Sequence, residues 1–148
     1  MNALRAAGLK PAAEEPEADP YFAAMSALEG IKRERVGIKE AYSRLSSTLR
    51  FFIGRSFGID ALRMTTSEIG RRLRREARTL ARGRGIPSER IMGILRKSDL
   101  VKFAKETPPS ESVAEDIEET ARILEEVRAA AGGTDSPRDG APQEVGGA

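Results

Sequence analysis

Residues 38–57 read IKEAYSRLSSTLRFFIGRSF, and their apolar side chains recur every three or four positions. This spacing places them on one side of an α-helix, so the stretch predicts a helix with one buried stripe. The stripe consists of Tyr42, Leu45, Leu49, Phe52, Ile53 and Phe57. Gly58 follows, and glycine there is typical of a helix C-terminus because it adopts the left-handed backbone conformation without steric cost.

The segment before this helix, residues 21–33, has the same kind of spacing. Its apolar side chains recur at steps of three and are Phe22, Met25, Leu28 and Ile31. The whole region between residues 20 and 131 has no alternating strand pattern and no hairpin dipeptide. These patterns together predict an all-helical protein.

The clearest helix start lies after the first two segments. Thr65 and Glu68 have the spacing of a capping box, in which each side chain binds the other residue's backbone N–H. The predicted helix then carries Ile69, Leu73, Ala77 and Leu80, and ends at Gly83 and Gly85. Pro87 suits the first position of the next helix, which contains Ile91, Ile94 and Leu95.

Two further helical segments are predicted after Lys97. Asp99 is expected to cap a short one, with Lys102 solvated and a core formed by Leu100, Val101, Phe103 and Ala104. Pro108 and Pro109 end it. Ser112 and Glu115 form a second capping box before the last helix, whose apolar residues are Val113, Ile117, Ala121, Leu124 and Val127.

The two ends of the chain differ from this pattern. Residues 1–19 are rich in Ala, Glu and Pro, and residues 132–148 are rich in Gly and Pro. Such segments bury too little apolar surface to offset their conformational entropy, so both are predicted to be disordered tails. The expected fold, over residues 20–131, is an all-α, compact orthogonal bundle of five or six helices with a helix-turn-helix-like pair.

The composition of the 148 residues excludes several function classes, because histidine and cysteine are both absent. A disulfide framework, a thiolate nucleophile, a Ser-His-Asp triad and a zinc site built on His or Cys are therefore excluded. Carboxylates, lysines, Ser, Thr and Tyr remain, but no glycine loop or aromatic lining indicates a catalytic cleft. We expect a non-enzymatic protein with no cofactor and no metal.

The same sequence predicts a cytoplasmic location. Residues 1–19 lack the apolar region of a signal peptide, and no run of 18 apolar residues could span a bilayer. Absence of cysteine fits a reducing compartment.

An arginine-rich face is the most distinctive feature of the chain. On the helix that begins near Thr66, one arc of about 100° contains Arg71, Arg74, Arg75, Arg78 and Arg82; we call these five residues the arginine face. Ile69, Leu73 and Leu80 lie on the opposite side. A solvated helix face is one explanation, and a surface that binds phosphates or carboxylates is the other, because the planar guanidinium pairs with both in a bidentate manner.

Three kinds of partner fit this face. Nucleic acid is the first, because the helix that follows would present Ser88, Glu89, Arg90, Gly93 and Lys97 to a groove. An anionic membrane surface is the second. An acidic protein is the third, and the last helix offers such a surface within one molecule or between copies, through Glu111, Glu115, Asp116, Glu118, Glu119, Glu125 and Glu126.

Several strings of the chain resemble one bacterial family. They include Asp19-Pro20-Tyr21, Tyr42-Ser43-Arg44-Leu45 followed by Leu49-Arg50, residues 55–62, Met64-Thr65-Thr66-Ser67-Glu68-Ile69 and, most specifically, the string SDLVKFAK at residues 98–105 with Pro108 after it. Over about residues 19–128 the chain is similar to the cytoplasmic helical domain of BatD-like and related membrane proteins. These are typically encoded beside MoxR-type AAA+ ATPases and von Willebrand factor A (VWA) domain proteins.

This resemblance implies a cytoplasmic adaptor that works with an AAA+ ATPase or a VWA protein at the inner membrane. It implies no catalytic residues. Relatives usually carry a transmembrane helix before this domain, whereas residues 1–19 here are polar. The arginine face is not part of the family pattern.

Overall fold

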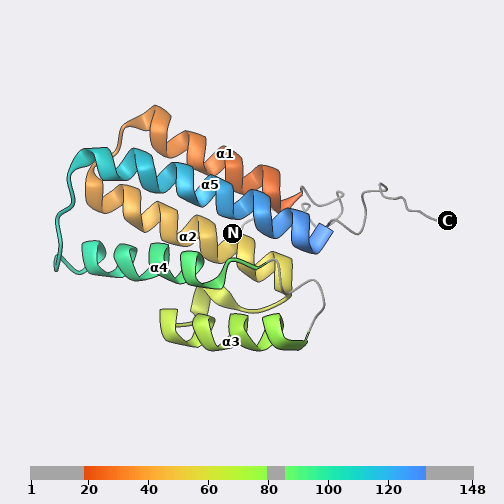
Figure 1. Ribbon diagram of the computed structural model, residues 1–148. Helices are drawn as coiled ribbons and strands as arrows, with labels where there is room; N and C mark the ends of the chain where they lie inside the picture. The colour runs from red at the N-terminus through yellow and green to blue at the C-terminus, as the bar shows by residue number, and fades with distance from the viewer. Residues whose placement is uncertain (1–18, 80–85, 133–148) are drawn as a thin grey trace, which may run out of the picture.

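The computed structural model describes residues 19–79 and 86–132, and these form a compact all-α bundle, which confirms the predicted fold class. Figure 1 shows α1, α5, α2 and α4 lying alongside one another, with α3 on the outer side of α4. The elements are α1 (Pro20–Glu34), α2 (Ile38–Phe57), the short 3₁₀ helix η2 (Ala61–Arg63), α3 (Thr66–Thr79), α4 (Ser88–Lys102) and α5 (Ser110–Gly132). Within the described ranges, no helix is long and apolar enough to cross a membrane.

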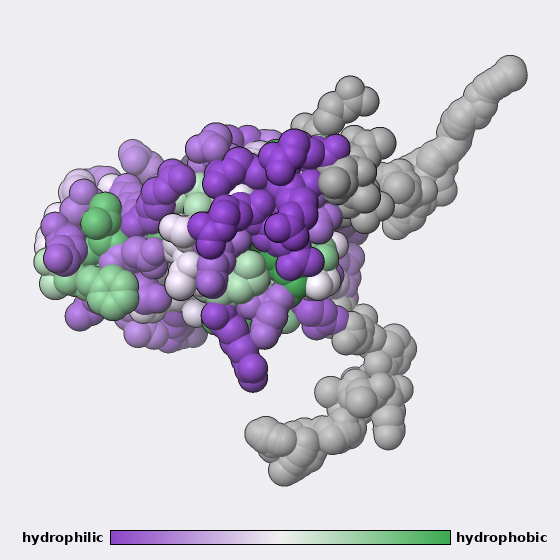
Figure 2. All heavy atoms as spheres, turned by 90° about the horizontal axis from the view of Figure 1, so that it is seen from below, coloured by the Kyte–Doolittle hydropathy of each residue, from purple (hydrophilic) through white to green (hydrophobic). Residues whose placement is uncertain are grey.

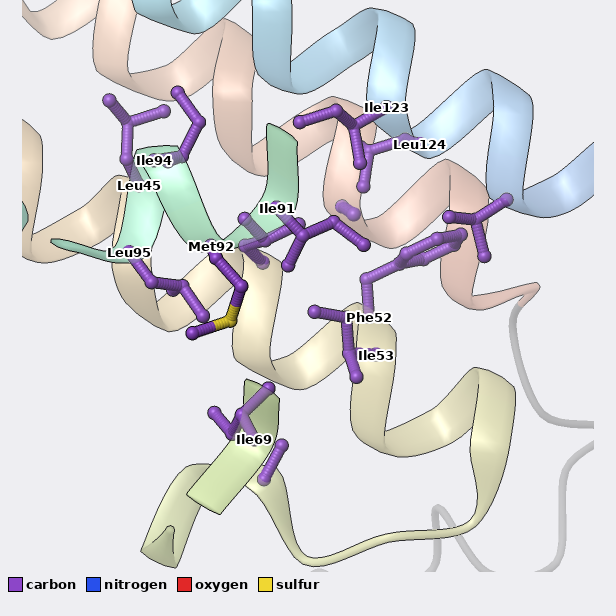
Figure 3. Close-up of a cluster of buried hydrophobic side chains, with 14 of the residues drawn as sticks. Leu45, Phe52, Ile53, Ile69, Ile91, Met92, Ile94, Leu95, Ile123 and Leu124 are labelled. Atoms are coloured by element: carbon purple, nitrogen blue, oxygen red, sulfur yellow. The ribbon is translucent and has the colours of Figure 1, made fainter. Parts of the chain in front are cut away.

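The central element is α2, which packs against α1, α4 and α5. The predicted stripe is buried, except that Phe57 is only half-buried. Figure 3 shows Leu45, Phe52 and Ile53 of α2 in one cluster of buried apolar side chains with residues of α4 and α5. The other members labelled there are Ile69, Ile91, Met92, Ile94, Leu95, Ile123 and Leu124. The core-facing side chains of α2 therefore form one wide stripe, which contacts several helices at once.

The helix boundaries agree closely with the local signals. Gly58 ends α2 in the left-handed conformation with φ 68°, and its N–H donates to the carbonyl of Gly54 at 2.8 Å. The capping box is confirmed in both directions, since the Thr65 N–H donates to Glu68 Oε1 at 2.9 Å and the Glu68 N–H donates to Thr65 Oγ1 at 3.1 Å. Pro87 occupies the N-cap of α4, one residue before its predicted place.

The prediction for residues 99–104 is wrong in most respects. Asp99 does not cap a separate segment, because α4 continues through it to Lys102, which is half-buried. Only Val101 is buried, whereas Leu100 is 40% exposed, Phe103 is 68% exposed, and Ala104 is exposed as well. At 100° per residue, Phe103 points almost opposite to Val101, so one uninterrupted helix cannot bury both against the same neighbours.

Two smaller predictions are also corrected. The last helix begins at Ser110, and the hydroxyl of Ser112 accepts a hydrogen bond from Lys97 Nζ at 3.4 Å rather than capping the helix. Phe22, predicted to be in the core, is 58% exposed. Its ring lies under the guanidinium of Arg128, 4.9 Å away, and this contact covers it without burying it.

The predicted tails, residues 1–19 and 132–148, lie outside the described residues except for Asp19 and Gly132. Asp19 belongs to the bundle, because its carboxylate accepts the Tyr21 N–H at 2.9 Å and caps α1. The same carboxylate pairs with Arg128 at 3.5 Å, and Arg128 also stacks on Tyr21 at 4.4 Å. We call the contacts of Arg128 with Asp19, Tyr21 and Phe22 the Arg128 clamp. It joins the start of α1 to the last turns of α5.

The close approach at Gly54 generates a prediction. A Cβ there would lie 2.9 Å from the backbone carbonyl oxygen of Ile59, whereas a Cβ at Gly93 would meet nothing within 4 Å. We expect Gly54→Ala to lower the free energy of unfolding by about 1–3 kcal/mol through this clash. Gly93→Ala, also within a helix, should raise it by about 0.5–1 kcal/mol. Urea unfolding followed by circular dichroism measures both, and equal effects of the two substitutions would contradict the packing at Gly54.

Candidate interaction surface on α3

The helix α3 is fixed in place by its N-terminal capping box and by one buried face. Ile69 and Leu73 are fully buried. Gly70 allows α3 to approach α4 closely, because a Cβ there would lie 2.8 Å from Cε of Met92. The outer side of α3 therefore faces away from the bundle, at the edge of the molecule (Figure 1).

The structure places four members of the arginine face on this outer side. Arg71, Arg74, Arg75 and Arg78 are all exposed, opposite the buried Ile69 and Leu73. Arg82, the fifth, lies outside the described residues. Figure 2, seen from below, shows hydrophilic side chains covering most of the surface on this side of the molecule.

Acidic side chains near these arginines are already engaged. Glu76 pairs with Arg72 at 3.7 Å, and Glu68 belongs to the capping box. Among the residues described, no ion pair reaches Arg71, Arg74 or Arg78. The outer side of α3 therefore carries positive charge that the described part of the bundle does not neutralise.

The acidic helix α5 pairs with α4 instead. Arg90 donates to both carboxylate oxygens of Glu119, at 2.7 and 3.2 Å, and to Glu126 at 2.8 Å. Lys97 pairs with Asp116 at 2.8 Å. In Figure 1 α4 lies between α5 and α3. Of the seven acidic residues that the intramolecular hypothesis names, Asp116, Glu119 and Glu126 are thus paired with cations of α4.

The same ion pairs involve the face of α4 that the nucleic-acid hypothesis places in a groove. Of its five residues, Arg90 and Lys97 are the two cations, and α5 holds both. On α3, by contrast, Arg71, Arg74 and Arg78 have no ion pair among the described residues. Their charge suits backbone contacts rather than base contacts.

A polar cluster between α2, α4 and α5 was missed by the sequence analysis, which treated Tyr42 only as a core residue. The Tyr42 hydroxyl donates to Asp116, and Lys97 lies 5.8 Å from the centre of the Tyr42 ring. Burial, together with the Asp116 carboxylate, raises the pKa of the Tyr42 phenol well above its ordinary value. Lys97 Nζ donates to the Ser112 hydroxyl at 3.4 Å and pairs with Asp116 at 2.8 Å. The arrangement therefore ties α2, α4 and α5 together.

No local sequence pattern links Tyr42 to Asp116, because 74 positions separate them. Residues 19–79 and 86–132 also contain no group of three or more carboxylates that could hold a metal ion. The exposed arginines of α3 are consequently the strongest candidate site that the sequence and the structure have in common.

Comparison with known proteins found no matching family model, no similar curated protein and no similar solved structure.

The Arg90–Glu119 pair generates a prediction about pH. The Arg90 hydrogen bonds lower the pKa of the Glu119 carboxyl group, so this group stabilises the fold above the ordinary glutamate pKa of about 4.3. That contribution is lost as the pH falls through the lowered value. We expect Arg90→Gln to remove about 1 kcal/mol of stability at about pH 7 and much less at about pH 3.

The matched control is Arg96→Gln on the same helix, an exposed arginine with no ion pair among the described residues. Urea unfolding at both pH values measures the difference. An Arg90→Gln effect that does not change with pH would contradict the assignment.

Proposed function

We propose that this chain is a non-enzymatic helical interaction module that binds an acidic protein partner through the arginine face of α3. The observation that carries the proposal is that Arg71, Arg74 and Arg78 are exposed on one side of α3 and have no ion pair among the described residues. A capping box and a buried face hold the helix backbone that carries these cations in place. Pre-ordering of this kind reduces the entropic cost of binding.

The chemistry of arginine favours a partner rich in carboxylates. A guanidinium forms bidentate hydrogen bonds with a carboxylate, and a row of such pairs gives both orientation and fast association. The resemblance of residues 98–105 and of the other strings to BatD-like proteins supports a more specific partner, a MoxR-type AAA+ ATPase or a VWA protein. It also supports action in the cytoplasm, at the periphery of the inner membrane.

Nucleic acid is the second candidate, and the same free arginines favour it, because phosphates attract them as carboxylates do. Arg90 and Lys97, the two cations of the predicted reading face of α4, are both paired with carboxylates of α5. This candidate therefore predicts binding without sequence preference and with a steep dependence on salt. An anionic membrane surface is the third candidate on the same charge argument.

Charge reversal tests the proposal. We expect Arg74→Glu/Arg78→Glu to leave the helix content and the melting temperature almost unchanged, because both side chains are solvated. The same variant should lose at least about tenfold in capture of its partner, since each lost contact with a charged group costs about 1.5–3 kcal/mol. Arg33→Glu/Lys39→Glu is the matched control, because it changes the net charge equally on exposed cations of α1 and α2.

The measurement is a pull-down from lysate of the native host, with and without nuclease, read by mass spectrometry. Nuclease-resistant capture of an AAA+ ATPase or a VWA protein, lost in the α3 variant and kept in the control, would support the proposal. Loss of every partner on nuclease treatment, with duplex binding that weakens steeply between about 50 and 200 mM salt, would favour nucleic acid instead. Equal capture by both variants would overturn the role of the arginine face.

A further inference from the structure

Two exposed apolar side chains line one depression on the surface. Leu62 of η2 is 59% exposed and Phe103, at the end of α4, is 68% exposed. Both border a cavity of about 340 Å³, which is also lined by Ser46, Ser47, Arg50, Thr65, Thr66, Asp99 and Lys102. Only four large apolar side chains are exposed among the described residues, and two of them line this one depression.

The backbone at Phe103 is held by hydrogen bonds, although the side chain is exposed. The chain leaves α4 through a Schellman motif, in which the Ala104 N–H donates to the carbonyl of Val101 at 3.0 Å and the Lys105 N–H donates to that of Leu100 at 2.8 Å. Ala104 has φ 61°, in the left-handed region that residues other than glycine rarely adopt. An aromatic ring on a fixed turn loses little entropy when a partner covers it.

The wall of the depression is a hydrogen-bonded polar network that joins α2, α3 and α4. The Arg50 guanidinium donates to the carbonyls of Ala61 and Met64 and to the hydroxyl of Thr66. The Thr66 hydroxyl in turn donates to Asp99 at 2.6 Å. The Asp99 carboxylate therefore has a hydrogen-bond donor within the protein, and the network fixes the shape of the depression.

The charge of the lining is positive, because Arg50 and Lys102 face a single anion, Asp99. Asp99 accepts from Thr66, whereas no ion pair reaches Lys102 within the described part of the chain. The lining thus combines an apolar rim with one unpaired ammonium group.

We propose that this depression is a docking site for a protein segment that carries a large apolar side chain next to a carboxylate. The apolar side chain would lie between Leu62 and Phe103, and the carboxylate would pair with Lys102. This site is separate from the arginine face and does not depend on the function proposed for it. A segment long enough to reach both would bind with the two sites acting together.

The experiment is a selection of random peptides of about twelve residues, displayed on phage, against the full chain. We expect enriched peptides to carry Phe, Leu or Trp beside Asp or Glu, and a synthetic peptide of the consensus sequence to bind. Leu62→Ser/Phe103→Ser should weaken that binding at least about tenfold, as for central apolar contacts, and Lys102→Glu several-fold. Circular dichroism should show an unchanged fold, because these side chains are exposed or half-buried.

Two controls match these variants. Phe22→Ser removes another exposed aromatic ring and Lys39→Glu reverses another exposed cation, and both should leave binding unchanged. Arg74→Glu/Arg78→Glu should also leave it unchanged, which separates failure of this site from failure of the arginine face.

Three results would overturn the proposal. The first is the absence of an enriched peptide, and the second is a set of peptides without a carboxylate or with equal affinity for the variants. The third is self-association of the free protein in sedimentation that disappears in Leu62→Ser/Phe103→Ser, because it would assign the hollow to a second copy of this chain.

Discussion

Contact of one wide stripe of α2 with three other helices is the constraint on which the rest of the structure depends. The stripe meets α1, α4 and α5, and besides its apolar residues it buries small polar ones such as Ser46 and Thr48. Ser46 accepts a hydrogen bond from Arg50, so its hydroxyl is satisfied within the helix. The remaining helices each supply one apolar face, and their outer faces are free to carry charge.

Charge is distributed according to what lies next to each outer face. The cations of α4 that face α5 meet carboxylates, so Arg90 and Lys97 join helices rather than bind partners. On α3, no ion pair reaches Arg71, Arg74 or Arg78 among the described residues, and all three are exposed. The basic residues of α4 and the acidic residues of α5 thus form ion pairs within the molecule, whereas arginines of α3 form a charged outer surface.

The sequence was sufficient for the local features. The α2 stripe, Gly58 and the Thr65–Glu68 capping box depend on neighbouring residues alone, and all three were predicted. Tertiary contacts were not predictable: the Tyr42–Asp116 bond joins distant positions, and the exposure of Phe103 depends on which side of α4 meets α2. The arginine face was found because helical periodicity defines it, whereas the Leu62–Phe103 depression requires two segments whose proximity no local pattern encodes.

The Arg128 clamp has a mechanical consequence. The antiparallel helices α1 and α5 bring Asp19 and the last turn of α5 to the same end of the bundle, where the clamp connects them (Figure 1). A force that pulls residues 19 and 132 apart therefore acts across the α1–α5 contact and would peel the helices apart from that end, one layer at a time. The contacts of the Arg128 clamp bear such a load first, and the α1–α5 contacts behind them bear it in turn.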